Sequence, residues 1–500
     1  MALAFRSLVL ASCLIPLTAS AAPAYVAVTL GSLGGASVYG TGINASGQVA
    51  GWADTDATGA LHRHATLYSG GVLMNLGTLA GGTQSFGQAI NDAGIVAGHS
   101  NGAGTAGFHA ALFGGGTVTD LNAILGSPSS NAYAINASGD VAGALNTAGT
   151  THAFRYRGGV VTDLGTLGGT LSQAYGINAF GDVTGYAHVP SQDGHAFRYD
   201  AGGLIDLGTL GGRTSIGHGI DPLGQVVGET FLLGDAGPHA FLHDRTAMLD
   251  LGTLGGTASR ALAVNAADTI VGESTDAQGT LRAFVFAGGA MIDLNAVTSG
   301  LNGAVLSTAS AINDAGQIVA MSCTVPPTCS KAFRLDPVEA PKVVAVEYHH
   351  EGFDHYFMTA IADEIAKLDN GTIAGWARTG GTFNVYAGDQ VGTSPVCRFF
   401  STAFAPRSSH FYTANAPECA TVQRNPNWQF EARVFNVGAP DANGNCAAAT
   451  QPVYRLYNNG MGAAPNHRYT TRLATRAAML AQGWVPEGYG ADAVIMCAPL

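Results

Sequence analysis

The first candidate for chemistry is the segment GHSNG, residues 98–102, which satisfies the G-x-S-x-G pattern of serine hydrolases. That pattern places a nucleophilic serine on a sharp turn between a parallel strand and a helix. Glycine-rich sequence follows Ser100 instead of a helical pattern. Glycines equivalent to Gly98 recur at regular places along the chain, so this glycine belongs to a repeat. We interpret the match as accidental and predict no catalytic residue.

Several histidines and carboxylates could bind a metal ion, but their spacing fits no known site. The segment YHHEGFDH, residues 348–355, has Gly352 inside it and misses the spacing of the helical H-E-x-x-H zinc motif. The segments DTDATG from Asp54 and DANGN from Asp441 begin like calcium loops but lack the closing glutamate. Further histidines start a repeated strand at His64, His109, His152, His195 and His239. Repetition favours packing or hydrogen bonding, so we predict no metal and no cofactor.

Aromatic and polar side chains are the candidates for ligand binding, because flat apolar rings can stack on sugar rings. Trp376, Trp428 and Trp484 occupy equivalent places in a C-terminal repeat, whereas Trp52 has no repeat partner and is expected in a loop. Equivalent tryptophans are also typical of a repeated core, which is the alternative for these three.

One variable position of the N-terminal repeat supplies further candidates for ligand binding. It follows a recurrent serine by three residues and is occupied by Gln88, Tyr133, Tyr175 and His218, then by Leu262 and Ser310. A small polar ligand could bind at this position. The serines themselves could equally satisfy backbone groups at the start of each strand.

The repeat that carries these residues covers most of the chain. The phrase G-I-N-x-x-G-x-V-x-G occurs in seven variants, from GINASGQVAG at Gly42 to AINDAGQIVA at Ala311. Its Asn or Asp recurs every 42 to 48 residues, at Asn44, Asn91, Asn136, Asn178, Asp221, Asn265 and Asn313. A fixed period of this length indicates a repeated supersecondary unit.

Each repeat contains four short segments in which residue character alternates, such as SQAYGIN, GDVTGYA, HAFRY and LIDLG. Segments with this alternation, bounded by glycine, asparagine or aspartate turns, are predicted to be β-strands. Four-stranded units arranged around an axis form a β-propeller. Seven repeats therefore predict seven blades. A solenoid or β-helix is a weaker alternative because its coils are usually shorter.

The two ends of the repeat region predict how the ring closes. YVAVTLGSLGG from Tyr25 matches only the fourth strand of a repeat, whereas the last repeat stops after its third strand, KAFRL from Lys331. Residues 25–31 should complete the seventh blade as its outer strand. In the LGTLGG segments that cross between blades, glycine pairs such as Gly168 and Gly169 permit positive φ and close approach of the backbone.

The segments HAFRY and DLGTLGG resemble those of the bacterial extracellular repeat proteins named after the sequence His-Ala-Phe (HAF repeats). The resemblance covers about residues 25–336. It implies an exported protein with a propeller fold, and it implies no particular activity.

A different repeat follows a proline-bearing linker at residues 337–345. Three copies align on HYFMTA at His355, HFYTAN at His410 and HRYTTR at His467, each followed by a short helical pattern and a tryptophan. The segments VCRFF, SHFYT, VYRLYN and NHRYTT resemble a three-repeat domain of unknown function found in bacterial secreted proteins. We predict a smaller α+β domain with approximate three-fold symmetry over residues 346–500.

The first residues and the cysteines predict export. Residues 1–21 have a single positive charge, an apolar middle and a small-residue end, which is typical of a secretory signal peptide. The alternative is a lipoprotein attached through Cys13. The six other cysteines predict disulfides in an oxidising compartment. Cys323 and Cys329 flank a turn-rich loop and could pair, whereas the pairing among Cys397, Cys419, Cys446 and Cys497 stays open.

Charge and composition limit the partners. A net charge of −12 without a lysine or arginine cluster argues against nucleic acid, and no segment after the signal reaches the roughly 18 apolar residues of a membrane helix. With 70 glycines and only 11% charged residues, the chain suits many short, half-buried strands. We predict a mainly β protein with a signal peptide at 1–21, a seven-bladed propeller at 22–336, a linker at 337–345 and the α+β domain at 346–500.

These observations favour an exported, monomeric, non-catalytic binding or adhesion protein of the bacterial envelope or exterior. Its partner would be a glycan, a cell-surface polymer or a protein. One alternative is an extracellular carbohydrate-active lyase or hydrolase, since propellers also carry enzymes and fold alone does not decide. The other alternative is a structural surface protein that binds no small ligand.

Overall fold

A computed structural model describes most of the chain after the predicted signal peptide. It covers residues 25–56, 62–105, 107–147, 149–234, 237–287, 289–325, 328–338, 340–388, 393–401, 403, 407–441, 443–447, 449–461 and 465–500. The predicted signal peptide and Cys13 lie outside these residues. Ala24–Val338 forms one compact unit, and Glu339–Leu500 belongs to another.

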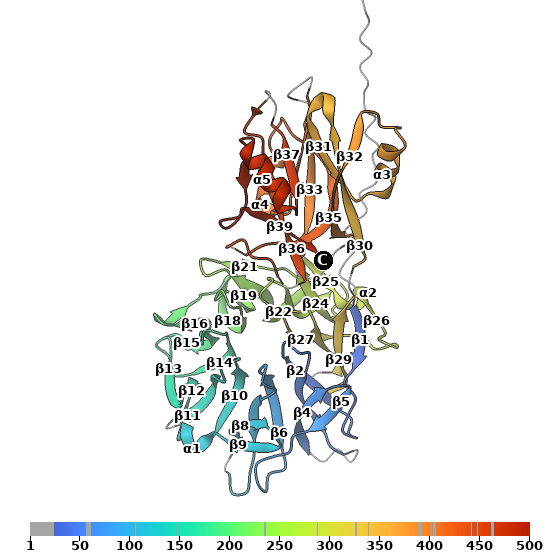
Figure 1. Ribbon diagram of the computed structural model, residues 1–500. Helices are drawn as coiled ribbons and strands as arrows, with labels where there is room; N and C mark the ends of the chain where they lie inside the picture. Colours follow the sequence, from blue (N-terminus) through green and yellow to red (C-terminus); the bar gives the residue numbers. More distant parts are fainter. Residues whose placement is uncertain are drawn as a thin grey trace, which may run out of the picture. The chain divides into compact units, whose positions relative to one another are not determined.

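The first unit is a propeller of seven sheets (Figure 1). In blades 1 to 6 the four strands follow chain order from the axis outward. Blade 1 has β2 (Val38–Ile43), β3 (Val49–Asp54), β4 (Arg63–Ser69) and β5 (Val72–Asn75); blade 2 has β6 (Ser85–Ile90), β7 (Val96–Ser100), β8 (His109–Gly114) and β9 (Thr117–Asp120). Blade 3 has β10 (Ser130–Ile135), β11 (Val141–Thr147), β12 (Thr150–Arg157) and β13 (Val160–Gly165).

The next blades follow the same plan. Blade 4 has β14 (Ser172–Ile177), β15 (Val183–His188), β16 (Gly194–Asp200) and β17 (Gly203–Asp206); blade 5 has β18 (Gly211–Ile220), β19 (Val226–Leu232), β20 (Pro238–His243) and β21 (Met248–Asp250). Blade 6 has β22 (Gly255–Val264), β23 (Ile270–Asp276), β24 (Leu281–Ala287) and β25 (Ala290–Asp293). Short helices α1 (Asn122–Leu125) and α2 (Leu294–Val297) follow blades 2 and 6.

Blade 7 closes the ring with the N-terminal strand, as the sequence predicts. It contains β27 (Thr308–Ile312), β28 (Ile318–Val325) and β29 (Thr328–Pro337), and β1 (Tyr25–Thr29) pairs antiparallel with β29 from Tyr25↔Pro337 to Thr29↔Phe333 (Figure 1). A short strand that the sequence did not predict, β26 (Thr298–Ser299), pairs parallel outside β1. The first strands of neighbouring blades contact each other around the ring, including β27 with β2.

The Ala and Phe of the His-Ala-Phe segments form the core between blades. Phe197 of blade 4 is fully buried and shares a cluster with Ala153 of blade 3. Phe154, Phe241 and Phe284 are buried in the same way, each with the alanine of the preceding blade. Burying such a side chain contributes about 1.5–3 kcal/mol. The alanine recurs in all seven copies, whereas Thr66 and Ala111 replace the phenylalanine in blades 1 and 2.

The repeated asparagine ties neighbouring blades together. The Asn44 side-chain oxygen accepts hydrogen bonds from the backbone N–H groups of Ser46 and Gln48, and its amide donates to the carbonyl of Asn91 in the next blade at 3.1 Å. The same bond between blades joins Asn136 to Asn178, Asn178 to Asp221, Asn265 to Asn313 and Asn313 to Asn44. The last of these closes the ring, whereas the carboxylate of Asp221 cannot donate such a bond.

The recurrent serines and histidines also have structural partners. The Ser172 hydroxyl accepts from Ala153 N–H of the preceding blade at 2.8 Å and donates to the Gly165 carbonyl at 2.5 Å. His152 Nδ1 lies 2.9 Å from Asp163 on the outer strand of its own blade. Equivalent pairs are His109–Asp120, His195–Asp206 and His239–Asp250, with His64–Asn75 as the variant. These histidines therefore pair within separate blades.

The crossing segment between blades needs both of its glycines. Gly168 has a φ of 102°, in the region that L side chains rarely adopt. A Cβ on Gly169 would lie 2.5 Å from His188 Cβ and 2.6 Å from the Val189 carbonyl oxygen. The outer strand can therefore pass to the next inner strand only where no side chain intervenes.

The second unit contains three copies of a strand–strand–helix–strand repeat. Copy 1 comprises β30 (Lys342–His350), η1 (Glu351–Phe353), β31 (His355–Thr359), α3 (Ala362–Asp369) and β32 (Trp376–Tyr386); copy 2 comprises β33 (Thr393–Ser401), β34 (Ser409–Thr413), α4 (Ala416–Gln423) and β35 (Gln429–Gly438). Copy 3 comprises β36 (Thr450–Tyr457), β37 (His467–Thr470), α5 (Leu473–Ala481), β38 (Val485–Glu487) and β39 (Val494–Pro499). The α+β expectation is confirmed.

Strand register corrects the alignment of copy 1. Val346 lies opposite Thr359, just as Cys397 lies opposite Thr413 and Tyr454 opposite Thr470. Counting back from these threonines, the equivalent of His410 and His467 is Tyr356. The alignment on His355 is therefore wrong by one residue, and a one-residue shift in a strand reverses the face to which a side chain points.

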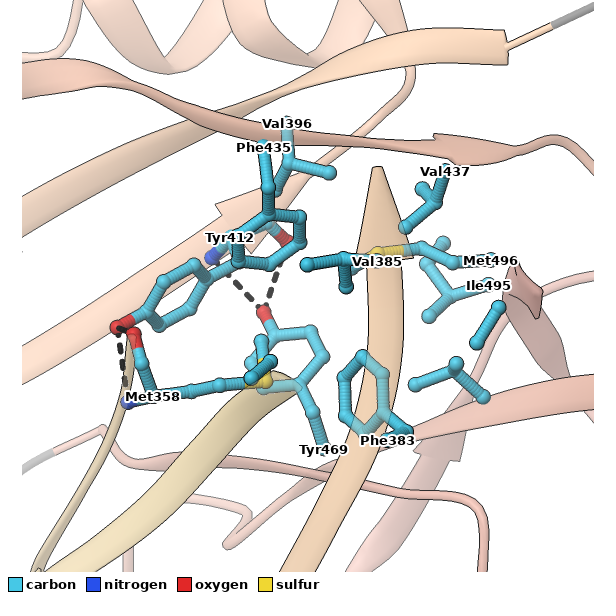
Figure 2. Packing of buried hydrophobic residues seen from close by; sticks show 13 residues of the cluster. Met358, Phe383, Val385, Val396, Tyr412, Phe435, Val437, Tyr469, Ile495 and Met496 are labelled. Carbon is cyan, nitrogen blue, oxygen red and sulfur yellow. Dashed lines mark hydrogen bonds between the residues drawn. The ribbon is translucent and has the colours of Figure 1, made fainter. Parts of the chain in front are cut away.

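Tyrosine hydroxyls join the three copies inside their shared core (Figure 2). The Tyr469 hydroxyl bonds to the backbone N–H and carbonyl of Tyr412, and the Tyr412 hydroxyl bonds in the same way to Met358. Copy 1 has Met358 at this position and continues the series no further.

All six cysteines in the described residues form disulfides. Cys323 pairs with Cys329, as the sequence suggests. The open choice in the C-terminal domain resolves into two local bonds, Cys397–Cys419 and Cys446–Cys497. In the described part of the chain, no helix is long and apolar enough to cross a membrane.

Candidate binding site on the propeller

A β-bulge in every first strand sets one variable residue apart. In blade 3 the pairing shifts between Ala132 and Ala134, which leaves Tyr133 as the bulged residue. The equivalent positions, called the bulge ring here, are Thr41, Gln88, Tyr133, Tyr175, His218, Leu262 and Ser310. All seven side chains are partly exposed. The candidates Gln88, Tyr133, Tyr175 and His218 therefore share one structural position.

A second variable position lies beside the bulge ring on the second strand. In each blade this position pairs with the first-strand residue that lies two before the bulged residue. We call its occupants the second-strand ring: Trp52, His99, Ala144, Tyr186, Glu229, Glu273 and Met321. Each except Met321 directly follows the repeated glycine of that strand. Sequence reasoning missed this ring apart from Trp52, although a variable residue beside a repeated glycine was a visible signal.

Tyrosines and a histidine meet across blades 3 to 5. The ring centroids of Tyr133 and Tyr175 lie 5.3 Å apart, and Tyr175 lies 5.7 Å from His218 and 6.0 Å from Tyr186. The Tyr175 hydroxyl donates to Gln173 Oε1 at 2.9 Å. Burial raises the pKa of both Tyr133 and Tyr175, so their hydroxyls remain protonated. Three of the predicted candidates therefore form one cluster.

Charged residues continue this cluster across blades 5 to 7. Arg260 donates from Nε to Glu229 at 2.6 Å and from Nη1 to Glu273 at 3.2 Å, and Thr308 donates to the other Glu273 oxygen at 2.7 Å. His218 Nε2 lies 3.6 Å from Glu229, too far for a hydrogen bond. The Arg260 side chain is 49% exposed between carboxylates that are 11% and 14% exposed. Its guanidinium is thus held in place and presented to solvent.

Electrostatics keeps Glu229 ionised. Burial alone would raise the pKa of this carboxyl, but His218 and Arg260 beside it together lower the pKa. We refer to Tyr133, Tyr175, Tyr186, His218, Glu229, Arg260, Glu273 and Thr308 as the polar arc.

The aromatic candidate Trp52 lies in a neighbouring part of the same rings. It belongs to strand β3 and not to a loop, which corrects the expectation from the sequence. Its ring stacks on Tyr39 with centroids 4.0 Å apart and meets Phe86 of blade 2 edge-on at 5.4 Å. The Arg63 guanidinium lies 5.0 Å above the same ring. Blades 1 and 2 therefore present stacked aromatic residues where blades 5 to 7 present charges.

Several buried polar atoms on these rings, or on side chains that contact them, have no hydrogen-bond partner among the described residues. They are Tyr39 Oη, His99 Nδ1, His188 Nδ1 and His218 Nε2. Burial lowers the pKa of His99 to about 4, so its ring is neutral near pH 7. Leaving a buried polar atom unpaired costs about 1–3 kcal/mol, which favours water or a ligand at these positions.

The C-terminal tryptophans lie in three separate clusters, one in each copy. Trp376 packs with Val346, Tyr348, Phe357 and Leu368; Trp428 packs with Phe399, Phe411 and the Cys397–Cys419 disulfide; Trp484 packs with Leu456 and Met479. The structure does not bring them together on one surface. Their surroundings favour the packing alternative over stacking on sugars.

The remaining motifs have structural contacts of their own. The Ser100 hydroxyl accepts from Leu79 N–H and donates to neighbouring carbonyls inside the propeller. Asp441 accepts backbone N–H bonds from Asn443 and Asn445, as in an ordinary turn. Within the described ranges, no three His, Cys, Asp or Glu side chains gather as a metal site would require.

An open groove of about 460 Å³ lies away from these rings. Its lining comes from the outer strands and turns of blades 1 and 2: His64, Asn75, Leu76, Gly77, Phe113, Gly114, Gly116 and Thr117. Backbone and repeated residues dominate it. We therefore place the candidate site at the polar arc, where the copies differ.

Comparison with family models finds a match within the C-terminal domain. The model of a family described as "Domain of unknown function (DUF5648)" matches residues 344–494. A comparison with curated proteins gives no match.

Solved structures with partial similarity include propeller-like proteins. TolB from Acinetobacter baumannii is 14% identical, with 59% of this chain and 64% of TolB covered and a TM-score of 0.33. The gluconolactonase XC5397 from Xanthomonas campestris is 12% identical, with 65% and 98% covered and a TM-score of 0.30. AofleA from Arthrobotrys oligospora is 10% identical, with 54% and 87% covered and a TM-score of 0.32. Likenesses at this level carry no argument about function.

Proposed function

We propose that the polar arc binds a glycan or a similar hydroxyl-rich polymer outside the cytoplasm and leaves it unchanged. The observation that carries this proposal is the continuous row of side chains from Tyr133 through Tyr175 and His218 to Arg260. These residues occupy positions that vary between blades, whereas the residues that pack the blades repeat.

The chemistry of the arc suits an uncharged sugar. Tyrosine rings offer faces for stacking, and tyrosine hydroxyls together with a fixed guanidinium offer hydrogen bonds to hydroxyl or acetyl groups. Glu229 and Glu273 outnumber Arg260, so the arc carries excess negative charge. An acidic polymer would be repelled by this excess, whereas a neutral glycan would not.

Other features support a location at the bacterial envelope or exterior. The His-Ala-Phe segments resemble those of exported repeat proteins, and residues 1–21 resemble a signal peptide. Three disulfides are stable chiefly in oxidising compartments. Secretion, the HAF family, a monomeric state and the absence of nucleic-acid partners remain parts of this proposal.

A carbohydrate-active enzyme is the second candidate, because two carboxylates face one arginine in the arc. Glycosidases use a pair of carboxyl groups as acid and base or nucleophile. Glu229 and Glu273 would be that pair. We favour binding because both carboxylates are already engaged by Arg260, and Glu273 also accepts a hydrogen bond from Thr308.

The test uses the whole chain from residue 22 in a binding screen against soluble neutral glycans, acidic glycans and cell-wall polymers. Every incubated sample is also analysed for cleavage products. We expect saturable binding of a neutral glycan with no product. Cleavage would replace this proposal with the enzyme, and absence of binding throughout would favour a protein partner or a structural role.

Two substitutions locate the site. Arg260→Gln removes the guanidinium and Tyr175→Phe removes one hydroxyl, and each should weaken binding by about tenfold, or 1.4 kcal/mol. Arg245→Gln is the matched control, since Arg245 donates to the Leu223 carbonyl at a turn of blade 5. Unchanged affinity in both arc variants would move the site elsewhere.

A further inference from the structure

A row of side chains joined by hydrogen bonds and ion pairs in the C-terminal domain ends at a serine. His355 Nδ1 lies 2.8 Å from the Ser408 hydroxyl, and His355 Nε2 lies 2.8 Å from His410 Nδ1. His410 Nε2 lies 3.3 Å from Glu431 Oε2, and Arg398 Nε lies 2.8 Å from the same oxygen. The row links β31, β34 and β35 within copies 1 and 2.

The carboxylate in ion-pair contact with His410 at one end favours one direction for the two hydrogen bonds in the row. An ionised glutamate only accepts, so His410 must carry its proton on Nε2, facing Glu431. His410 Nδ1 then accepts from His355 Nε2–H, because a neutral imidazole has one donor and one acceptor nitrogen. His355 Nδ1 is left as an acceptor, and the Ser408 hydroxyl donates to it. This arrangement polarises the serine as a nucleophile–base pair requires.

Only one of the three interfaces between copies has this row. Register places Ser409, Pro465 and His467 at the equivalents of His355, Ser408 and His410 between copies 2 and 3. Between copies 3 and 1 the equivalents are Asn466, Asp354 and Tyr356. His467 Nδ1 accordingly has no hydrogen-bond partner among the described residues. Packing of the domain therefore does not by itself require a serine–histidine–histidine row.

We propose that Ser408 is an activated nucleophile that accepts an acyl group, with His355 as its general base and His410 and Glu431 as positioning residues. The site lies in the C-terminal domain and is independent of glycan binding by the propeller. Sequence analysis missed it because Ser408 lies 53 residues from His355 and belongs to a different copy.

Burial sets the protonation state and the reactivity of this site. His355 is fully buried, and burial together with the nearby imidazoles of His410, His350 and His349 lowers its pKa to about 2. The ring is therefore neutral at neutral pH and can accept a proton. A base with so low a pKa drives proton transfer weakly, so we expect slow reaction with activated esters and phosphonyl fluorides. Ser408 itself is half-buried.

The reaction step balances without a cofactor. Ser408 Oγ attacks the carbonyl carbon of an activated ester, its proton passes to His355 Nδ1, and the carbon–oxygen bond to the leaving alcohol breaks. His355 returns the proton to the departing alkoxide. Water then attacks the acyl-serine by the reverse route, which yields the acid and restores the serine hydroxyl.

The experiment treats the full chain with a fluorophosphonate probe and identifies modified residues by peptide mass spectrometry. The probe forms an Oγ–phosphorus bond and loses fluoride, while the serine proton leaves through His355. We expect one modified residue, Ser408, and complete loss of the label in Ser408→Ala. Ser409→Ala, which changes the adjacent buried serine, should keep the label. Absence of a label on Ser408 in the folded chain would overturn the proposal.

A matched pair of variants distinguishes positioning from general stability. Glu431 and Glu487 make equivalent contacts, Glu431 with Arg398 and His410, and Glu487 with Arg455 and His467. Glu431→Gln should slow labelling by about tenfold, whereas Glu487→Gln should leave the rate unchanged despite a similar loss of contacts. Equal labelling rates in the two variants would show that Glu431 does not position the histidines for the reaction.

Discussion

The propeller and the C-terminal domain both join repeated units, but they join them with different chemistry. In the propeller, an asparagine amide of one blade donates to the backbone of the next, so the same bond recurs. In the C-terminal domain, Arg398 binds Glu364 of copy 1 and Arg455 binds Glu418 of copy 2. The third interface reverses the charges, with Arg468 of copy 3 on Glu347 of copy 1.

In the first unit, the residues that hold the blades together are not the variable residues of the candidate binding site. In the second unit, the ion pairs that stabilise an interface also select which copies meet there. Bonds to backbone groups work for any neighbouring blade, so the side chains of the bulge ring and second-strand ring are free to vary. Ion pairs between particular side chains instead distinguish the interface between copies 3 and 1 from the other two interfaces, which share the same arginine–glutamate pair. A reversed pair between copies 3 and 1 favours one order of contacts, because an arginine facing another arginine would be strongly unfavourable.

The largest effect should come from removing the strand that closes the propeller. Deleting residues 22–33 removes β1 and exposes the pocket of Tyr25 and Leu30, which are 1% and 3% exposed. Each buried side chain contributes about 1.5–3 kcal/mol, and the pairing with β29 is lost as well. Thermal unfolding followed by circular dichroism should show a large fall in Tm. An unchanged Tm would contradict closure by β1, and Val26→Thr, at a 44% exposed position of the same strand, is the control.

Reversing the charged pair between copies 3 and 1 tests the second mode of joining. Glu347→Arg alone places two cations in a buried site and should destabilise the domain by about 3–5 kcal/mol. Arg468→Glu alone should have a similar effect, and the double variant should recover most of the loss. Chemical denaturation measures all three free energies of unfolding. Simple addition of the two single effects would show that the pair does not specify the interface.

Acid should weaken the C-terminal domain more than the propeller. Burial, aided by neighbouring charges, lowers the pKa of His355 to about 2 and of His467 to about 3, and burial also lowers the pKa of His410. Unfolded histidine titrates near about pH 6.5, so the unfolded state binds more protons below that value. Stability is therefore complete above about pH 6.5 and falls toward pH 3, by up to about 1.4 kcal/mol per histidine per pH unit.

A tryptophan variant makes this measurement specific to the domain. Trp52 is the one propeller tryptophan among four in the chain, so Trp52→Phe leaves only Trp376, Trp428 and Trp484 as fluorescent reporters. Denaturation of that variant should require less urea at about pH 5.5 than at about pH 7.5, and show little change from there to about pH 8.5. Equal urea midpoints at about pH 5.5 and about pH 7.5 would contradict the prediction.

The smallest effect concerns the blade that lacks the repeated asparagine. Asp221 is 1% exposed and cannot donate to Asn265 of the next blade. Asp221→Asn should restore that bond and stabilise the propeller by about 1 kcal/mol, whereas Asn178→Asp should remove one and destabilise it by a similar amount. Urea denaturation followed by circular dichroism measures both changes in the free energy of unfolding. A gain in the free energy of unfolding for Asp221→Asn and a loss for Asn178→Asp would support the ring of asparagine bonds. Changes in the same direction in both variants would contradict it.

The architecture of the propeller was predictable because the blades bury side chains at the same positions of a repeated pattern. The period of the Asn44 motif, the alternation within each strand and the missing outer strand after Lys331 together indicated seven blades closed by residues 25–31, where the structure has β1. The partners of the repeated groups, such as Ser172 with Ala153 of the preceding blade, follow from that architecture. They could not be derived from spacing alone.

The candidate sites were only partly predictable. Tyr133, Tyr175 and His218 stood out because they vary within a repeat, but Glu229 and Arg260 did not, since their pairing crosses from one blade to the next. Trp52 was assigned to a loop although its strand follows the common pattern. In the C-terminal domain, aligning copy 1 on His355 hid its one-residue offset and the contact with Ser408.

The sequence by itself determined the repeating elements of both units, because burial and turn formation act locally and leave a periodic pattern. It also determined the closing strand, since an incomplete last repeat needs a matching partner at the other end. Only the tertiary structure decided which cysteines pair and which charges meet across blades. It alone joined Ser408 to Glu431 through two histidines. These contacts depend on distances between residues far apart in the chain, which periodicity does not encode.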